Sequence, residues 1–259
     1  MQKDPVYLKN GDDDMLIING RILTMAGADY EHGYLYCKGK IIKKVGDMKE
    51  FPESIREKCQ KEQDQVLDVQ GAWVMPGLID AHCHVGIAEE KWGAIGDDCN
   101  EMTTPVTPQI RALDGINPMD PAFHDAIQAG ITSLMTGPGS SNVVGGQSVF
   151  MKVQGRCLDD MVVKAPAAMK IAFGENPKVN YGDKDKMPGS RMAIAGMLRE
   201  ELYQAFQYDE EKKKGNIESG KEHFRMECWL PVLRREIPLK AHVHRADDIL
   251  TAIRIAKEF

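Results

Sequence analysis

The sequence predicts an α/β protein in two parts: a small β-sandwich over residues 1–75, then alternating strands and helices over residues 76–259. Short β-like runs joined by tight-turn sequences predict the first part. Apolar strand-like runs that alternate with helical stretches predict the second part, because this order is typical of parallel βα units. Such units form either an α/β barrel or a doubly wound sheet.

Tight turns mark the hairpins of the first part. Asn19-Gly20 lies between two apolar runs and supplies the positive φ angles that a hairpin turn needs. Lys38-Gly39-Lys40 repeats the pattern. A charged stretch over residues 50–63 is expected to be helical. The predicted strands are residues 16–18, 21–25, 34–37, 41–45, 66–69 and 72–75.

Capping residues mark several helix ends in the second part. Ser190 is a good N-cap for a helix that ends at Gly215. Asp247 and Asp248 open the last helix, where acidic side chains interact favourably with the helix dipole. Residues 137–147, rich in Gly and Ser, are expected to be a loop that either covers a pocket or is simply flexible. Strands are expected at residues 77–82, 131–135, 167–173 and 239–242, and a further helix at residues 121–130.

Composition excludes several classes of protein. Lys and Arg total 33 against 39 Asp and Glu, a net charge of −6, which gives no support for nucleic-acid binding. The sequence holds no apolar run of about 18 residues, so no membrane-spanning helix is expected. Six cysteines without a CxxC pair favour a reducing compartment. We therefore expect a cytoplasmic protein that acts on a small molecule and binds neither nucleic acid nor membrane.

The segment Asp80-Ala81-His82-Cys83-His84 carries the chemistry. Side chains alternate along a strand, so Asp80, His82 and His84 share one face. Two imidazoles at this spacing can bind one metal ion, and barrel enzymes place their active sites at the carboxyl ends of strands. A His-x-His pair is also common on protein surfaces. The apolar strand and the Pro76-Gly77 turn that precede it favour the metal site.

Five segments carry a family resemblance. They are residues 74–85, 129–133, 145–148, 169–178 and 238–249. Together they resemble the amidohydrolase superfamily, in its branch of imidazolonepropionase-related and prolidase-like enzymes. The resemblance implies a β-sandwich beside a (β/α)8 barrel, with one or two divalent metal ions at the barrel mouth. Zinc is the first candidate for that metal.

The resemblance assigns metal ligands by position. His82 and His84 match the ligands of the first barrel strand, and His242 matches the ligand of the fifth. His244, two residues further on, is expected either to contact substrate or to lie behind the ligands. Asp80 is expected either to hold a ligand histidine or to bond a nearby backbone amide.

The remaining ligand implied by the resemblance is an anionic oxygen donor, for which two residues compete. One is Glu175, and the other is Lys170 after conversion to a carbamate by carbon dioxide. A carbamylated lysine is long and suits the middle of a strand, whereas a glutamate is short and suits its end. Glu175 follows Gly174 and is preferred on this ground, with Lys170 as the alternative.

Superfamily members complete the site with a histidine from the sixth strand and a general-base aspartate from the eighth. Neither can be matched in residues 76–259, which correspond to about strands 1–5 of an incomplete barrel. We therefore expect a complementing C-terminal fragment or a homo-oligomer, and doubtful activity for the 259-residue chain alone.

The expected function is that of a metal-dependent hydrolase. The resemblance implies attack of metal-bound hydroxide on an amide-type C–N bond of a small, peptide-like or cyclic substrate. The alternative is a catalytically incompetent fragment of such an enzyme, which binds only metal or a partner chain.

Overall fold

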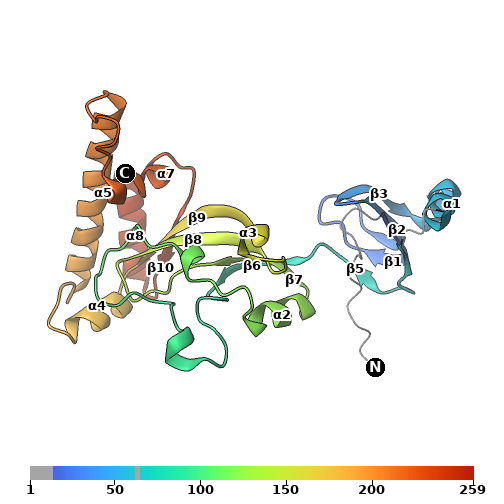
Figure 1. The fold of residues 1–259 in the computed structure, drawn as a ribbon, viewed down its shortest axis with the longest axis horizontal. Coiled ribbons are helices and arrows are strands. Elements are labelled where there is room, and N and C mark those ends of the chain that lie inside the picture. The colour runs from blue at the N-terminus through green and yellow to red at the C-terminus, as the bar shows by residue number, and fades with distance from the viewer. Residues whose placement is uncertain (1–13, 62–64) are drawn as a thin grey trace. The chain divides into compact units, whose positions relative to one another are not determined.

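The computed structural model describes residues 14–61 and 65–259. The chain divides into two compact units, Met1–Gly77 and Leu78–Phe259, and most of their helices and strands are labelled in Figure 1. Residues 62 and 63 of the expected helical stretch lie outside the described residues.

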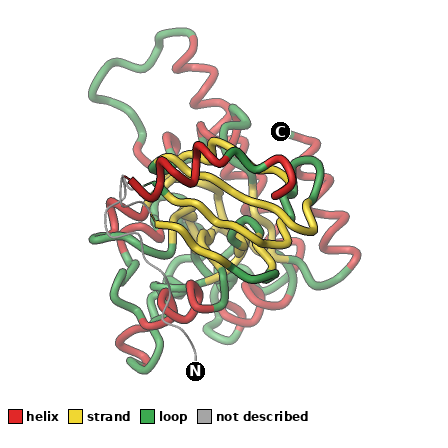
Figure 2. The backbone as a smooth tube through the Cα atoms, turned by 90° about the vertical axis from the view of Figure 1, so that its right-hand side faces the viewer, coloured by secondary structure: helices red, strands yellow, loops and turns green. Residues whose placement is uncertain are grey.

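A five-stranded sheet, drawn in yellow in Figure 2, forms the first unit. Its strand order is β3-β2-β1-β4, with β5 also paired to β1. Side chains of β1 alternate in burial, and Leu16 and Ile18 pack in a core with Tyr34, Tyr36 and Ile55. The predicted β-sandwich is not confirmed, because the described residues form one sheet with a helix packed on it. The elements are β1 (Met15–Ile22), β2 (Tyr30–Lys38), β3 (Ile41–Asp47), η1 (Met48–Glu50), α1 (Glu53–Lys61), β4 (Gln65–Asp68) and β5 (Trp73–Val74).

Of the two predicted hairpin turns, the first is wrong and the second is confirmed. Asn19 and Gly20 lie inside β1, where the pairing with β2 shifts register. Asn19 does adopt a positive φ of 59°, but it lies at an irregularity within the strand and not in a turn. The chain reverses later, at residues 23–29. Gly39, with a φ of 53°, makes the predicted turn between β2 and β3.

The second unit is built on a five-stranded sheet in the order β10-β9-β8-β7-β6. The strands are β6 (Leu78–Cys83), β7 (Ile131–Thr136), β8 (Val144–Lys152), β9 (Val162–Ala172) and β10 (Leu239–His242). The sheet curls like half of a barrel (Figure 1), which supports the predicted incomplete barrel. β6 pairs in parallel with β7, and β9 pairs in parallel with β10.

The expectation of parallel strands throughout is wrong for β8. This strand runs antiparallel to both β7 and β9, and it begins at Val144, inside the stretch predicted as a loop. Only residues 137–143 separate β7 from β8. A parallel crossover needs about a dozen residues or more, so this short connection imposes an antiparallel pair.

Two helices of the second unit begin at a capping side chain. Asp120 accepts a hydrogen bond from Ala122 N at 3.0 Å, and Ser190 accepts one from Ala193 N at 3.2 Å, which confirms the predicted N-cap. Among the described residues, none of the helices combines the length and apolar composition that a membrane crossing needs. The helices are η2 (Gly93–Gly96), η3 (Ala112–Asp114), α2 (Pro121–Gln128), α3 (Leu158–Met161), α4 (Glu175–Gly182), α5 (Arg191–Lys213), α6 (Phe224–Glu227), α7 (Leu230–Leu233) and α8 (Ala246–Glu258).

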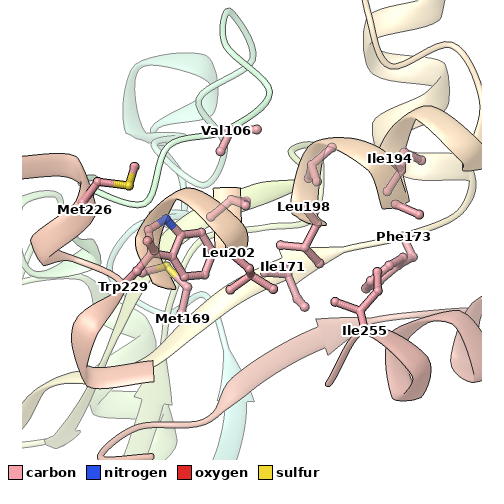
Figure 3. Packing of buried hydrophobic residues seen from close by; sticks show 14 residues of the cluster. Val106, Met169, Ile171, Phe173, Ile194, Leu198, Leu202, Met226, Trp229 and Ile255 are labelled. Carbon is pink, nitrogen blue, oxygen red and sulfur yellow. The ribbon is translucent and has the colours of Figure 1, made fainter. Parts of the chain in front are cut away.

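The largest core lies between β9 and the long helix α5 (Figure 3). Met169, Ile171 and Phe173 point from β9 and its end into this core, where they join residues of α5 and the fully buried Trp229. Side chains alternate across a strand, so Lys170, which lies between Met169 and Ile171, points to the opposite face of the sheet. The packing of α5 therefore decides which side of β9 is available for a site.

Leu198 tests how strongly this core stabilises the unit. It lies on α5, is fully buried and packs in the cluster of Figure 3. Leu198→Ala is expected to lower the free energy of unfolding by about 2–5 kcal/mol, because it removes buried methyl groups and leaves a cavity. Urea unfolding measures the change. Met192→Ala on the same helix, at a side chain 83% exposed, is the control and should change stability by less than about 0.5 kcal/mol. Equal effects of the two substitutions would contradict the packing.

Candidate functional site

The first histidine pair lies at the carboxyl end of β6. The rings of His82 and His84 are 5.3 Å apart between centroids and nearly perpendicular. Nδ1 of His84 donates to the carbonyl oxygen of Gly137 at 2.7 Å, since a carbonyl only accepts. In the neutral tautomer that this bond selects, Nε2 of His84 carries the lone pair. Asp80 Oδ1 accepts a hydrogen bond from the backbone N–H of His82 at 3.0 Å. Of the two expected roles of Asp80, the structure therefore shows the bond to a backbone amide.

The second histidine pair lies at the carboxyl end of β10. The rings of His242 and His244 are 4.3 Å apart between centroids. Nε2 of His242 is buried, and no group in the described part of the chain hydrogen-bonds to it. Leaving a buried polar atom without a partner costs free energy. The Nε2 atom of His242 is therefore available to accept a hydrogen bond or to coordinate a metal ion.

Lys170 lies on the same face of the sheet as His242. In the β9–β10 register Lys170 pairs with Lys240, and Ala172 pairs with His242. Paired residues of neighbouring strands share a face, and alternation along each strand then puts Lys170, Lys240 and His242 together. Lys170 is only 3% exposed, which is unusual for a lysine.

The charge of Lys170 contributes to the lowered pKa values of His82 and His242. Partial desolvation of the exposed His82 side chain, followed by the charges of Lys170 and Lys240, lowers the pKa of His82 to about 4. Burial, followed by His244 and Lys170, lowers the pKa of His242. Lys170 thus acts on one histidine from each pair. Both imidazoles are neutral at pH 7, which is the protonation state that binds a metal ion.

Glu175 lies further out than Lys170. Gly174, with a φ of 78°, turns the chain out of β9, and Glu175 opens helix α4. The Glu175 side chain is 63% exposed, and its Oε1 accepts from His244 Nδ1 at 2.8 Å. The structure therefore pairs Glu175 with His244 and leaves Lys170 between the two histidine pairs.

The donor set agrees with a metal site only in part. No three His, Cys, Asp or Glu side chains within residues 14–61 and 65–259 are close enough to hold a metal ion together. The histidines gather instead around a lysine, which is a metal ligand only after carboxylation. Two features agree with a metal: the neutral imidazoles and the unpartnered Nε2 of His242. The residues present therefore supply neutral nitrogen ligands for a divalent ion, but as they stand they would need a carboxylated Lys170 for the anionic oxygen.

The stretch at residues 137–147 is neither an exposed cover nor a free loop. Most of it is buried, and its second half belongs to β8. Gly139 N donates to the carbonyl oxygen of Cys99 at 2.7 Å, and Ser141 N donates to Asn100 Oδ1 at 3.0 Å. The long connection between β6 and α2, which carries Cys99, therefore lies against this stretch. Sequence patterns did not identify that connection as part of the site.

Lys240 and Cys99 are the site residues that sequence reasoning missed. Burial and Asp97 raise the pKa of the Cys99 thiol and the charge of Lys170 opposes them, so Cys99 lies near Lys170. No sequence signal pointed to Cys99. A sequence signal did exist for Lys240: it precedes His242 by two residues, so the two side chains lie on the same face of the strand.

Comparisons with known proteins find relatives named amidohydrolase and adenine deaminase. No family model matches the chain. An amidohydrolase, tasK, of Hapsidospora irregularis is 25% identical over 287 residues, which cover 99% of this chain and 29% of that protein. An adenine deaminase of Listeria welshimeri is 28% identical over 167 residues, covering 63% of this chain and 22% of the enzyme. The crystal structure of an amidohydrolase from Thermotoga maritima superimposes with a TM-score of 0.85 at 39% identity, covering 94% of this chain and 62% of that one. The chain thus spans less than two thirds of each of these proteins.

Proposed function

We propose that this chain, which belongs to the amidohydrolase superfamily, carries part of the active site of a hydrolase that cleaves a C–N bond of a small molecule. Relatives named amidohydrolase and adenine deaminase support hydrolytic C–N bond cleavage in general. Within the superfamily we retain the imidazolonepropionase-related and prolidase-like branch, and with it a peptide-like or cyclic substrate, as the working assignment.

One observation carries the proposal: a buried lysine lies on the sheet face between two histidine pairs. Lys170 is 3% exposed and acts electrostatically on both His82 and His242. Burial lowers its own pKa, as does the neighbouring Lys240. A lysine of lowered pKa has more of the neutral amine, which is the form that reacts with carbon dioxide.

Superfamily members generally use divalent metal ions, and zinc is our first candidate here. His82, His84 and His242 would hold the metal, with an anionic oxygen from Lys170 as carbamate or from Glu175. A bound divalent ion lowers the pKa of water and polarises the substrate carbonyl. The His84–Gly137 hydrogen bond already sets the His84 tautomer that such a site needs.

His244 is the residue placed to meet substrate. It is 51% exposed, beside the ring of His242, and Glu175 holds its Nδ1. A carboxylate on one imidazole nitrogen fixes the proton there and leaves the other nitrogen for a partner. We assign His244 a substrate-contacting role, with Glu175 orienting it.

Metal analysis paired with a hydrolysis screen tests the proposed function. The protein to use is the longest natural polypeptide that contains this sequence, and the substrates are dipeptides, cyclic amides and aminopurines. We expect one or two divalent ions per chain and hydrolysis of one substrate class, abolished by a chelator and restored by added zinc. A protein free of metal after growth in zinc-supplemented medium, and inactive on all three classes, would refute the proposal.

A further inference from the structure

Lys240 links the two ends of the half-barrel sheet. It lies on β10, the strand that carries His242, at one end of the strand order, while β6, with His82, lies at the other end. The two strands do not pair with each other in this sheet. The Lys240 amine nevertheless donates to the carbonyl oxygen of Ala81 in β6, 159 residues earlier in the chain. It also contacts Met135 Sδ of β7 at 3.5 Å.

The accepting carbonyl belongs to the peptide unit that leads into His82. Ala81 C=O and His82 N–H are the two polar groups of one planar peptide bond. The carbonyl accepts from Lys240, and the N–H donates to Asp80 Oδ1 at 3.0 Å. A peptide plane held at both of its polar groups has a set orientation, and this orientation directs the bond from Cα to Cβ of His82.

We propose that Lys240 is a positioning residue that orients His82 and sets its spacing from His242 across the half-barrel. Lys240 and His242 point to the same face of β10, so a contact between Lys240 and β6 fixes both strands against each other at the site. The inference rests on the proposed function, because its consequence is the affinity of the histidines for metal.

The bond to Ala81 distinguishes Lys240 from an ordinary half-buried lysine. A charged donor to a carbonyl is stronger than a neutral hydrogen bond, and it ties β10 directly to β6. In the sheet order, three strands lie between β10 and β6. Substitution of a residue that orients a metal ligand without binding the metal itself typically weakens metal affinity by about 10–100-fold.

Substitution of Lys240 with a matched control tests the inference. Lys240→Met keeps the length of the side chain and removes the donor, while Lys240→Arg keeps both donor and charge. Lys152→Met is the control, since Lys152 bonds Ser133 Oγ at 3.0 Å within the same sheet but contacts none of the histidines. Zn²⁺ affinity is measured by competition with a chromophoric chelator on the longest natural polypeptide, and unfolding of the metal-free protein is followed by circular dichroism.

We expect Lys240→Met to bind Zn²⁺ about 10–100-fold more weakly, and Lys240→Arg and Lys152→Met to stay within about threefold of wild type. Lys240→Met with wild-type affinity would overturn the inference. If Lys240→Met does not fold, Lys240→Arg decides: a folded Lys240→Arg protein that binds Zn²⁺ about tenfold more weakly or worse also overturns it. A wild-type protein that binds no Zn²⁺ refutes the proposed function itself, which is a different result.

Discussion

Replacement of both His82 and His84 by alanine is expected to remove the divalent metal while leaving the fold in place. Four-ligand zinc sites are held by roughly 10–16 kcal/mol, so loss of two ligands should weaken binding by on the order of 10³-fold or more. The fold should survive because both residues lie at the end of β6 and His82 is exposed. The single hydrogen bond that is lost, from His84 to Gly137, costs about 1 kcal/mol.

Metal content of the purified double variant, by elemental analysis, checks this expectation. His124→Ala is the matched control, because His124 is an exposed histidine of α2 and lies outside the site. The control should keep the wild-type metal content. A double variant that retains stoichiometric metal would show that the ligands lie elsewhere.

The second large effect is expected from Lys170→Met. We propose Lys170 as the source of the anionic oxygen, since Lys170 is buried near both histidine pairs and Glu175 is exposed and bonded to His244. Lys170→Met keeps the length and apolar stem of the side chain but cannot form a carbamate. It should weaken metal binding by on the order of 10²-fold, whereas Glu175→Gln should change it by less than about tenfold.

Bicarbonate supplies a second readout for this comparison. If Lys170 is carbamylated, wild-type protein prepared without carbon dioxide should take up less metal, and added bicarbonate should restore it. Lys170→Met should not respond. The opposite pattern, with metal lost in Glu175→Gln and kept in Lys170→Met, would establish Glu175 as the ligand.

The choice between Lys170 and Glu175 depends on contacts that no sequence pattern encodes. Side-chain length favoured Glu175, because a short carboxylate suits the end of a strand. That argument holds for one strand by itself. It cannot foresee that α4 begins at Glu175 and directs it to His244, or that α5 packs against Met169 and Ile171 and so turns Lys170 toward the histidines.

The Asn19-Gly20 pair shows the same dependence on distant contacts in the fold. The predicted positive φ is found at Asn19 but not at Gly20, whose φ is not positive. Whether that conformation makes a hairpin or an irregularity within a strand depends on what the flanking residues pair with. β1 is also paired with β4 and β5 from further along the chain, and these contacts carry it through the Asn-Gly pair.

The sequence by itself determined the features that depend on a few neighbouring residues. These include the β6 strand with His82 and His84 at its carboxyl end, the Ser190 cap, the Gly39 turn and the resemblance to amidohydrolases. Only the tertiary structure decided the antiparallel direction of β8, the position of Lys170 between the histidine pairs and the bond from Lys240 to Ala81. The reason is physical: hydrogen bonds and charge contacts between residues as far apart as 159 positions form only after the chain has packed, and no local pattern encodes them.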